Sequence, residues 1–221
     1  MIEEQVQIVI AHYGVNRRIT EAECLSALPT GSQKNIFVDF GVGYAALEDL
    51  YDLAFENIAL AQRRQFTETL KPLLEKYPSA TIAYFGFIPI PVGLHLGYLV
   101  GNTHPYTIYQ LHHQSNKWFA DHATPKIGYT FELKPTALPI EKQRGKGEVV
   151  IRIGTSFAID QQSTAEVVPT PANEFDIAVV TPDVDALFSQ GNIQAVVNAF
   201  QEVLNSYANL LTDREKIHLF V

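Results

Sequence analysis

Residues 81–113 read TIAYFGFIPIPVGLHLGYLVGNTHPYTIYQLHH, and this stretch decides the fold. Its apolar run Ile82–Phe87 is typical of a strand buried on both faces of a parallel sheet. Pro89 and Pro91 then predict an extended corner without a helix. The glycines at 93, 97 and 101 lie on one face of the helix expected next, where they would let another backbone approach. The strand Thr107–Leu111 completes a Rossmann-like unit, and such units bind ligands at the carboxyl ends of their strands.

The segments Ala83–Pro89, Gly93–Gly97 and Tyr106–Leu111 resemble the SAVED family. Its members are sensor modules of bacterial antiviral systems (CBASS and CRISPR) that respond to cyclic oligonucleotides. The chain differs from the family pattern at Phe87-Ile88, where smaller residues are commoner before the proline. The resemblance implies two fused CARF-like halves, with a ligand whose binding changes how modules stack and so switches on an effector.

Composition restricts the class of protein. The chain has 221 residues, of which 47% are apolar, enough for one large domain or two small ones. Its net charge of −8 argues against coating long nucleic acid, because that affinity depends on neutralising phosphates. Cys24 is the single cysteine, so no internal disulfide can form, and a cytoplasmic location is expected. The chain shows neither a signal peptide nor an apolar run long enough to span a membrane.

The second half repeats the pattern of the first. Strands are expected at Val6–Ala11, Ile36–Phe40 and Thr81–Phe87, and again at Val149–Gly154, Phe175–Val180 and Lys216–Val221. A long helix precedes the third strand in each half, and Asn192 is the expected N-cap of the second one. We therefore expect an α/β fold of two pseudo-repeated Rossmann-like lobes. The first covers residues 1–117, a connector with a short strand at Ile127–Leu133 covers 118–147, and an incomplete second lobe covers 148–221, lacking its last helix and strand.

Candidate ligand-binding residues follow the predicted strand ends. A cyclic oligonucleotide needs cations for phosphates, polar groups for base edges and aromatic planes for stacking. If a pseudo-two-fold axis relates the lobes, the loops after their first strands face each other across one cleft. The predicted set comprises Tyr13, Arg17, Arg18, Phe87, Pro89, Gln110, His112, His113, Trp118, Thr155 and Ser156.

Structural roles remain open for several of these residues. Arg17 and Arg18 could be solvated loop charges, Phe87 a packed corner, and Trp118 either a stacking platform or a cap on the core. Thr155 and Ser156 could be turn residues.

Metal and catalytic sites find little support in the sequence. His112 and His113 are adjacent on a strand and point to opposite faces, and His95 stands alone on an apolar helix. The sequence has no GxSxG elbow, P-loop or GxGxxG, and Asp39-Phe40-Gly41 lacks the other kinase motifs. We therefore expect no metal, no cofactor and no enzyme activity.

These observations predict a sensor module that binds a cyclic oligonucleotide of the tri- or tetranucleotide class. It would control an effector, supplied by another part of the gene product or by another chain, through ligand-induced oligomerisation. The alternative is a ring nuclease or another Rossmann-like hydrolase acting on a similar ligand. A third possibility is an assembly module that binds no ligand.

Overall fold

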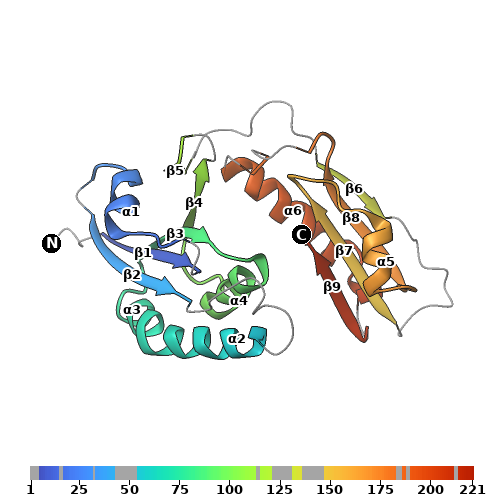
Figure 1. Ribbon diagram of the computed structural model, residues 1–221, viewed down its shortest axis with the longest axis horizontal. Coiled ribbons are helices and arrows are strands. Elements are labelled where there is room, and N and C mark those ends of the chain that lie inside the picture. Colours follow the sequence, from blue (N-terminus) through green and yellow to red (C-terminus); the bar gives the residue numbers. More distant parts are fainter. Residues whose placement is uncertain are drawn as a thin grey trace. The chain divides into compact units, whose positions relative to one another are not determined.

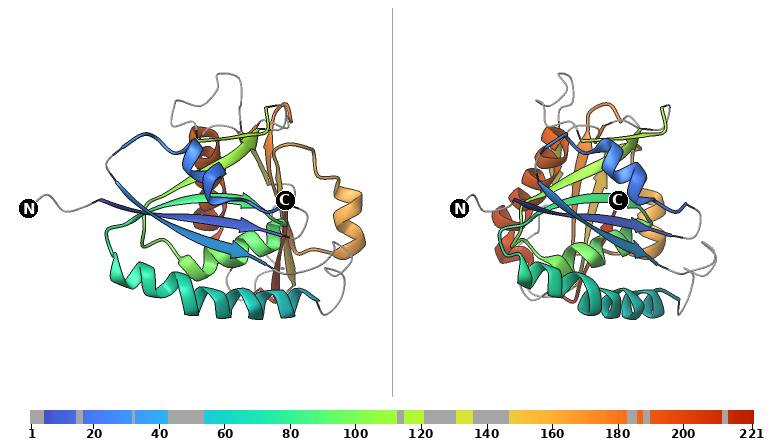
Figure 2. Two further views of the ribbon diagram at one scale, coloured as in Figure 1. Left: turned by 60° about the vertical axis from the view of Figure 1, so that its left-hand side comes forward. Right: turned by 90° about the vertical axis from the view of Figure 1, so that its left-hand side faces the viewer.

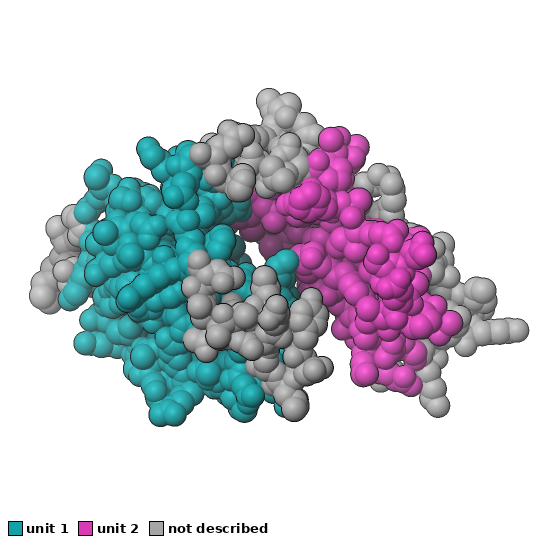
Figure 3. Space-filling model, viewed as in Figure 1, with its two compact units in different colours: residues 1–120 teal, residues 121–221 magenta. Residues whose placement is uncertain are grey.

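The computed structural model describes residues 5–14, 17–31, 33–42, 54–112, 115–120, 131–135, 147–182, 186–187, 190–211 and 214–221. The chain divides into two compact units, residues 1–120 and 121–221, which Figure 3 colours separately. Residues 43–53, which precede the first long helix, and most of the expected connector lie outside the described residues.

Unit 1 is built on a five-stranded sheet in the order β2-β1-β3-β4-β5 (Figure 1). Its four parallel strands are β1 (Val6–Tyr13), β2 (Lys34–Gly41), β3 (Thr81–Phe87) and β4 (Tyr106–His112). The short strand β5 (Lys117–Phe119) pairs antiparallel with β4. All four expected strands of this lobe are therefore present, with bounds that differ from the expected ones by at most two residues.

Helices cover both faces of this sheet, as Figure 2 shows from two further directions. Ile8 and Ile10 on one face pack against the π-helical turn η2 (Phe66–Leu70), α3 (Lys71–Lys76) and α4 (Ile90–Val100). Helix α2 (Ala54–Gln65) packs on α4 through Ile58 and Val92. The other face packs Val9 and Ala11 against Cys24 of α1 (Glu21–Ala27). This arrangement makes β1 buried on both faces, as its β-branched sequence requires.

The proline corner differs from the expectation. Helix α4 begins at Ile90, so Pro91 lies inside its first turn, where a proline is tolerated because its missing N–H has no helical partner there. Only Pro89, the N-cap, keeps an extended conformation. A Cβ on Gly97 would meet nothing within 4 Å, so no other backbone approaches this position among the described residues.

Unit 2 contains a four-stranded sheet in the order β6-β8-β7-β9. Strands β7 (Glu148–Gly154), β8 (Asn173–Val179) and β9 (Lys216–Phe220) are parallel, and β6 (Phe131–Pro135) runs antiparallel to β8. Apolar residues of β7 and β8 pack on α6 (Gln190–Ser206), which α7 (Ala208–Leu211) follows. On the opposite face, the buried Arg152 of β7 donates to Thr164 of α5 (Gln161–Val167) and pairs with Asp176 at 2.5 Å.

The two sheets share an order of elements. In each, the first strand lies between the second and the third, giving β2-β1-β3 and β8-β7-β9, with all three strands parallel. A seven-residue helix follows the first strand in both units, and longer helices precede the third. The expectation that Asn192 caps the second long helix is wrong: α6 begins at Gln190, and the Asn192 side chain is buried and donates to the carbonyl of Ala186.

Candidate functional site

The parallel strands of unit 1 all end at one edge of the sheet, and most of the predicted site residues lie there. Two backbone hydrogen bonds join the strand ends, from Gly14 to the carbonyl of Phe87 and from Val42 to the carbonyl of Tyr13. We call this region the carboxyl edge. It is the part of a parallel α/β sheet where ligands are usually bound.

An exposed charged cluster occupies the β1 and β2 side of the carboxyl edge. Asp39 of β2 accepts a hydrogen bond of 2.6 Å from the Tyr13 hydroxyl and one of 3.1 Å from Nη2 of Arg18. The Arg18 side chain is 73% exposed, so its ion pair with Asp39 is weak and replaceable. Desolvation, followed by the bond to Asp39, raises the pKa of Tyr13. Its ring packs closely over Gly41, where a Cβ would lie 2.8 Å from the ring.

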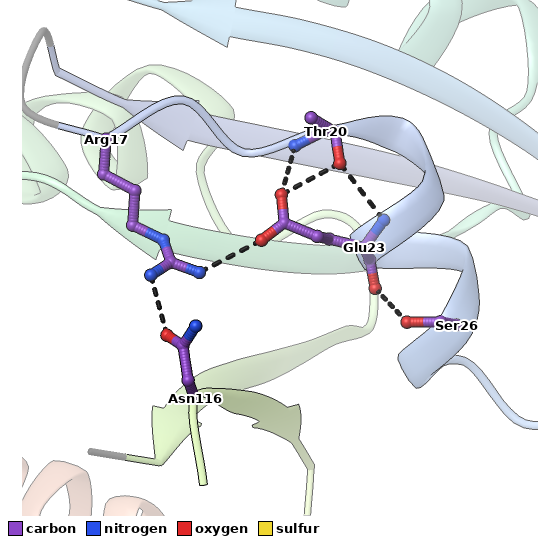
Figure 4. Close-up of polar contacts among 5 residues, drawn as sticks. All are labelled: Arg17, Thr20, Glu23, Ser26 and Asn116. Atoms are coloured by element: carbon purple, nitrogen blue, oxygen red, sulfur yellow. Dashed lines mark hydrogen bonds and ion pairs between the residues drawn. The ribbon is translucent and has the colours of Figure 1, made fainter. Parts of the chain in front are cut away.

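Arg17 is held far more firmly than Arg18. Its Nη2 contacts Glu23 at 3.0 Å and its Nη1 donates to Asn116 at 2.9 Å, as Figure 4 shows. The guanidinium also lies over the rings of Phe87 and Trp118, 5.8 Å and 5.9 Å from their centroids. Arg17 therefore connects the loop after β1 to α1, to the end of β3 and to the turn before β5.

The geometry around Arg17 depends on local capping. Thr20 and Glu23 form a reciprocal capping box at the start of α1, and the backbone bond from Thr20 is the largest cause of the lowered pKa of Glu23. Asn116 has a positive φ of 51°, a conformation that asparagine tolerates better than most residues. Both partners of Arg17 are thus fixed by their own turns.

The proline corner places an aromatic side chain at the carboxyl edge. Phe87 is 44% exposed although it ends a buried strand. Pro89 is half-buried, and its carbonyl accepts from the amides of Val92 and Gly93 in the first turn of α4. The exposed Phe87 ring is therefore available for stacking.

The β4 side of the edge is less open. Gln110 and His112 are half-buried, and Nδ1 of His112 accepts from the amide of Ser115. Trp118 is 6% exposed and packs edge-on against Phe85 at 5.4 Å, so of its two possible roles the structure supports a cap on the core. His113 lies outside the described residues.

Thr155 and Ser156 belong to unit 2, where they follow β7. Thr155 is buried and Ser156 is half-buried. The turn beyond them is tight, because a Cβ on Gly154 would lie 3.0 Å from the carbonyl oxygen of Phe157. Their contribution to a ligand site shared with the first lobe stays a prediction.

A network of polar side chains, buried at His12 and Gln62 and half-buried at Tyr84 and His95, lies behind the carboxyl edge, and the sequence pattern did not reveal it. His12 of β1 is fully buried, 2.8 Å from the Tyr84 hydroxyl and 3.0 Å from Nε2 of Gln62. Gln62 in turn contacts His95, so His95 is not isolated on its helix. Burial lowers the pKa of His12 to about 3 and raises that of Tyr84, and burial followed by the charge of Arg63 lowers the pKa of His95.

The carboxyl edge thus offers one exposed guanidinium, a tyrosine hydroxyl and an exposed aromatic ring. This combination suits an anionic ligand that carries planar bases. Among the described residues, no group of three or more His, Cys, Asp or Glu side chains could hold a metal ion. Every helix within the described ranges is too short or too polar to cross a membrane.

Comparison with known protein families gives a match for this chain. Residues 62–221 match the family described as SAVED, the SMODS-associated and fused to various effectors sensor domain. Tyr13, Arg17 and Arg18 precede the matched range, whereas Phe87, Trp118 and the other predicted site residues fall inside it. None of the curated proteins matches the chain.

Among solved structures, the chain is similar to the Acinetobacter baumannii Cap4 SAVED/CARF-domain containing receptor with the cyclic trinucleotide 3'3'3'-cAAA. The sequence identity is 13% and the TM-score 0.49, over 96% of this chain and 43% of that one. The chain therefore spans less than half the length of that receptor. Because the family match covers most of the sequence, this chain belongs to the SAVED family of sensor domains.

Proposed function

We propose that the chain is a sensor module that binds a cyclic oligonucleotide in antiviral defence and contacts it at the carboxyl edge of unit 1. The observation that carries the proposal is the SAVED family match over residues 62–221. The ligand class that the sequence predicts is a cyclic tri- or tetranucleotide, and the Cap4 receptor was solved with a cyclic trinucleotide.

The exposed residues of the edge support this ligand class. Arg18 can exchange its exposed ion pair with Asp39 for a pair with a ligand phosphate, since a single solvent-exposed carboxylate holds it. Phe87 can stack on a base, because its ring is 44% exposed. Arg17 is the weaker candidate for direct contact, because Glu23 and Asn116 already occupy its two terminal nitrogens.

In this proposal the ligand stays intact and the output is a change of assembly. Binding promotes self-association, and the larger assembly activates an effector in the cytoplasm. The rest of the predicted contact set comprises Tyr13, Pro89, Gln110, His112, His113, Trp118, Thr155 and Ser156.

The experiment titrates the purified chain with 3′–5′- and 2′–5′-linked cyclic di-, tri- and tetranucleotides by calorimetry. The recovered nucleotides are analysed by chromatography and the protein by sedimentation velocity. We expect one member to bind tightly, to be recovered intact and to increase the sedimentation coefficient. Linear products would identify a ring nuclease instead, and absence of binding across the panel would favour an assembly module.

A further inference from the structure

The network of polar side chains behind the carboxyl edge links four elements of unit 1. His12 comes from β1, Gln62 from α2, Tyr84 from β3 and His95 from α4. Nε2 of Gln62 also donates to the carbonyl of Val92, in the first turn of α4, at 3.1 Å. Gln62 is fully buried and joins the other members of this network, because it contacts both His12 and His95.

The contacts allow one arrangement of protons. Nε2 of Gln62 donates to two acceptors, which are the Val92 carbonyl oxygen and Nε2 of His12. Oε1 of Gln62 accepts from Nδ1 of His95. Turning the amide over would bring its oxygen against the Val92 carbonyl, so this carbonyl fixes the orientation. His12 must then carry its proton on Nδ1 and donate it to the Tyr84 hydroxyl.

Three of the residues that Gln62 links directly or through His12 are close in sequence to residues of the proposed ligand site. His12 directly precedes Tyr13, and Tyr84 lies three residues before Phe87. Tyr84 packs against Gly86, where a Cβ would lie 2.6 Å from its ring. Val92, held by Gln62, donates its amide to Pro89, the N-cap of α4. This network of polar side chains therefore fixes the ends of β1 and β3 and the start of α4 against one another.

We propose that Gln62, with His12 and His95, is a positioning residue that sets the geometry of Tyr13, Phe87 and Pro89 at the carboxyl edge. Its effect on ligand affinity rests on the proposed function, whereas its effect on the edge itself does not. Unlike a residue that only stabilises the fold, Gln62 acts on one end of the strands more than on the other.

Amide hydrogen exchange of the full chain tests this without a ligand. The amides of Gly14 and Val42 bond across the carboxyl edge, and the amide of Lys34 bonds to the carbonyl of Gln5 at the opposite end of the same strands. Gln62→Met keeps the size of the side chain but removes its hydrogen bonds. We expect it to speed exchange at Gly14 and Val42 at least tenfold more than at Lys34.

Two further comparisons separate positioning from general destabilisation. Leu74→Ala, at a buried core position of α3, should speed exchange at both ends of the strands alike. If Gln62→Met does not fold, the half-buried His95 provides the alternative pair: His95→Leu should act like Gln62→Met, and His95→Gln, which can still donate to Gln62, should resemble the wild type.

Binding of 3′–5′-linked cyclic tri- and tetraadenylate is measured on the same variants. We expect Gln62→Met to weaken it about tenfold and Leu74→Ala to leave it unchanged. Equal exchange changes at both ends in Gln62→Met, or none, would overturn the positioning role. If neither nucleotide binds the wild type, the ligand choice or the proposed function fails, and the exchange data still decide the role of Gln62.

Discussion

Arg17 and Arg18 are neighbours in sequence, yet the structure predicts opposite consequences for their removal. Arg17→Ala deletes a charged hydrogen bond to Asn116, an ion pair with Glu23 and two cation–π contacts, from a side chain that is only 24% exposed. A hydrogen bond to a charged group contributes about 1.5–3 kcal/mol, and each cation–π contact about 0.5–1 kcal/mol. Because these contacts share one side chain they do not add fully, and we expect a loss of about 2–3 kcal/mol in the free energy of unfolding.

Arg18→Ala deletes one exposed ion pair, so the free energy of unfolding should not change measurably. Its removal should instead weaken ligand binding by roughly tenfold or more, since a charged contact to phosphate is lost, and should reduce the salt dependence of the affinity. Arg64→Ala is the matched control, because Arg64 of α2 is similarly exposed and paired with Glu68 of η2.

Urea unfolding followed by circular dichroism, with calorimetric titration of the same samples, checks both expectations. With a slope of about 2 kcal/mol per molar urea, Arg17→Ala should lower the midpoint by about 1 M. The reasoning is refuted if Arg17→Ala unfolds like the wild type but loses ligand binding, because Arg17 would then be a ligand contact. It is refuted equally if Arg18→Ala and Arg64→Ala bind the ligand alike.

Three other expectations concern Phe87, His12 and Arg152. Phe87→Ala should weaken nucleotide binding by about 1–3 kcal/mol of stacking, whereas Leu94→Ala, which removes another exposed apolar side chain, should not; calorimetry compares them. The lowered pKa of His12, about 3, means that the unfolded state binds the proton first, so stability should fall by up to about 1.4 kcal/mol per pH unit as pH drops from 6.5 towards 3. Urea midpoints measured across that window should show this slope, and a His12→Asn variant that keeps the same slope would contradict it. Arg152→Met should lower the free energy of unfolding by roughly 3 kcal/mol, because Asp176 and Glu174 lose their shared buried cation; an unchanged unfolding curve would show that the pair contributes nothing.

The sequence was sufficient for the four parallel strands of unit 1, because they carry runs of β-branched and aromatic residues, as in Val6–Ala11 and Ile82–Phe87. It did not predict the short strand β5. It was less informative about short helices. Helix α1 has only seven residues, and its best signal is the capping box of Thr20 and Glu23 rather than any apolar stripe.

The candidate site could be predicted as a location but not as a set of contacts. Parallel strands end at one edge whatever their side chains, so Tyr13 and Phe87 were found from topology alone. Which arginine is exposed depends on Glu23, Asn116 and Asp39, and one of these is 99 positions from Arg17 in sequence. No local periodicity carries that information.

The network of polar side chains around Gln62 could not be predicted from the sequence for the same reason. His12 and Gln62 come from different elements, 50 positions apart, and each alone is an ordinary polar residue in an apolar pattern. Trp118 also needed the fold, since only the pairing of β5 with β4 places its ring on Phe85.

The most direct measurement maps a bound nucleotide onto the backbone by NMR. Isotope-labelled chain is titrated with the tightest-binding cyclic oligonucleotide, and amide shifts are recorded along the sequence. We predict that the largest shifts in unit 1 cluster at Tyr13, Arg18 and Phe87, and that the nucleotide remains cyclic. Saturable binding with these three amides unmoved, or shifts confined to the opposite end of the strands near Lys34, would contradict recognition at the carboxyl edge.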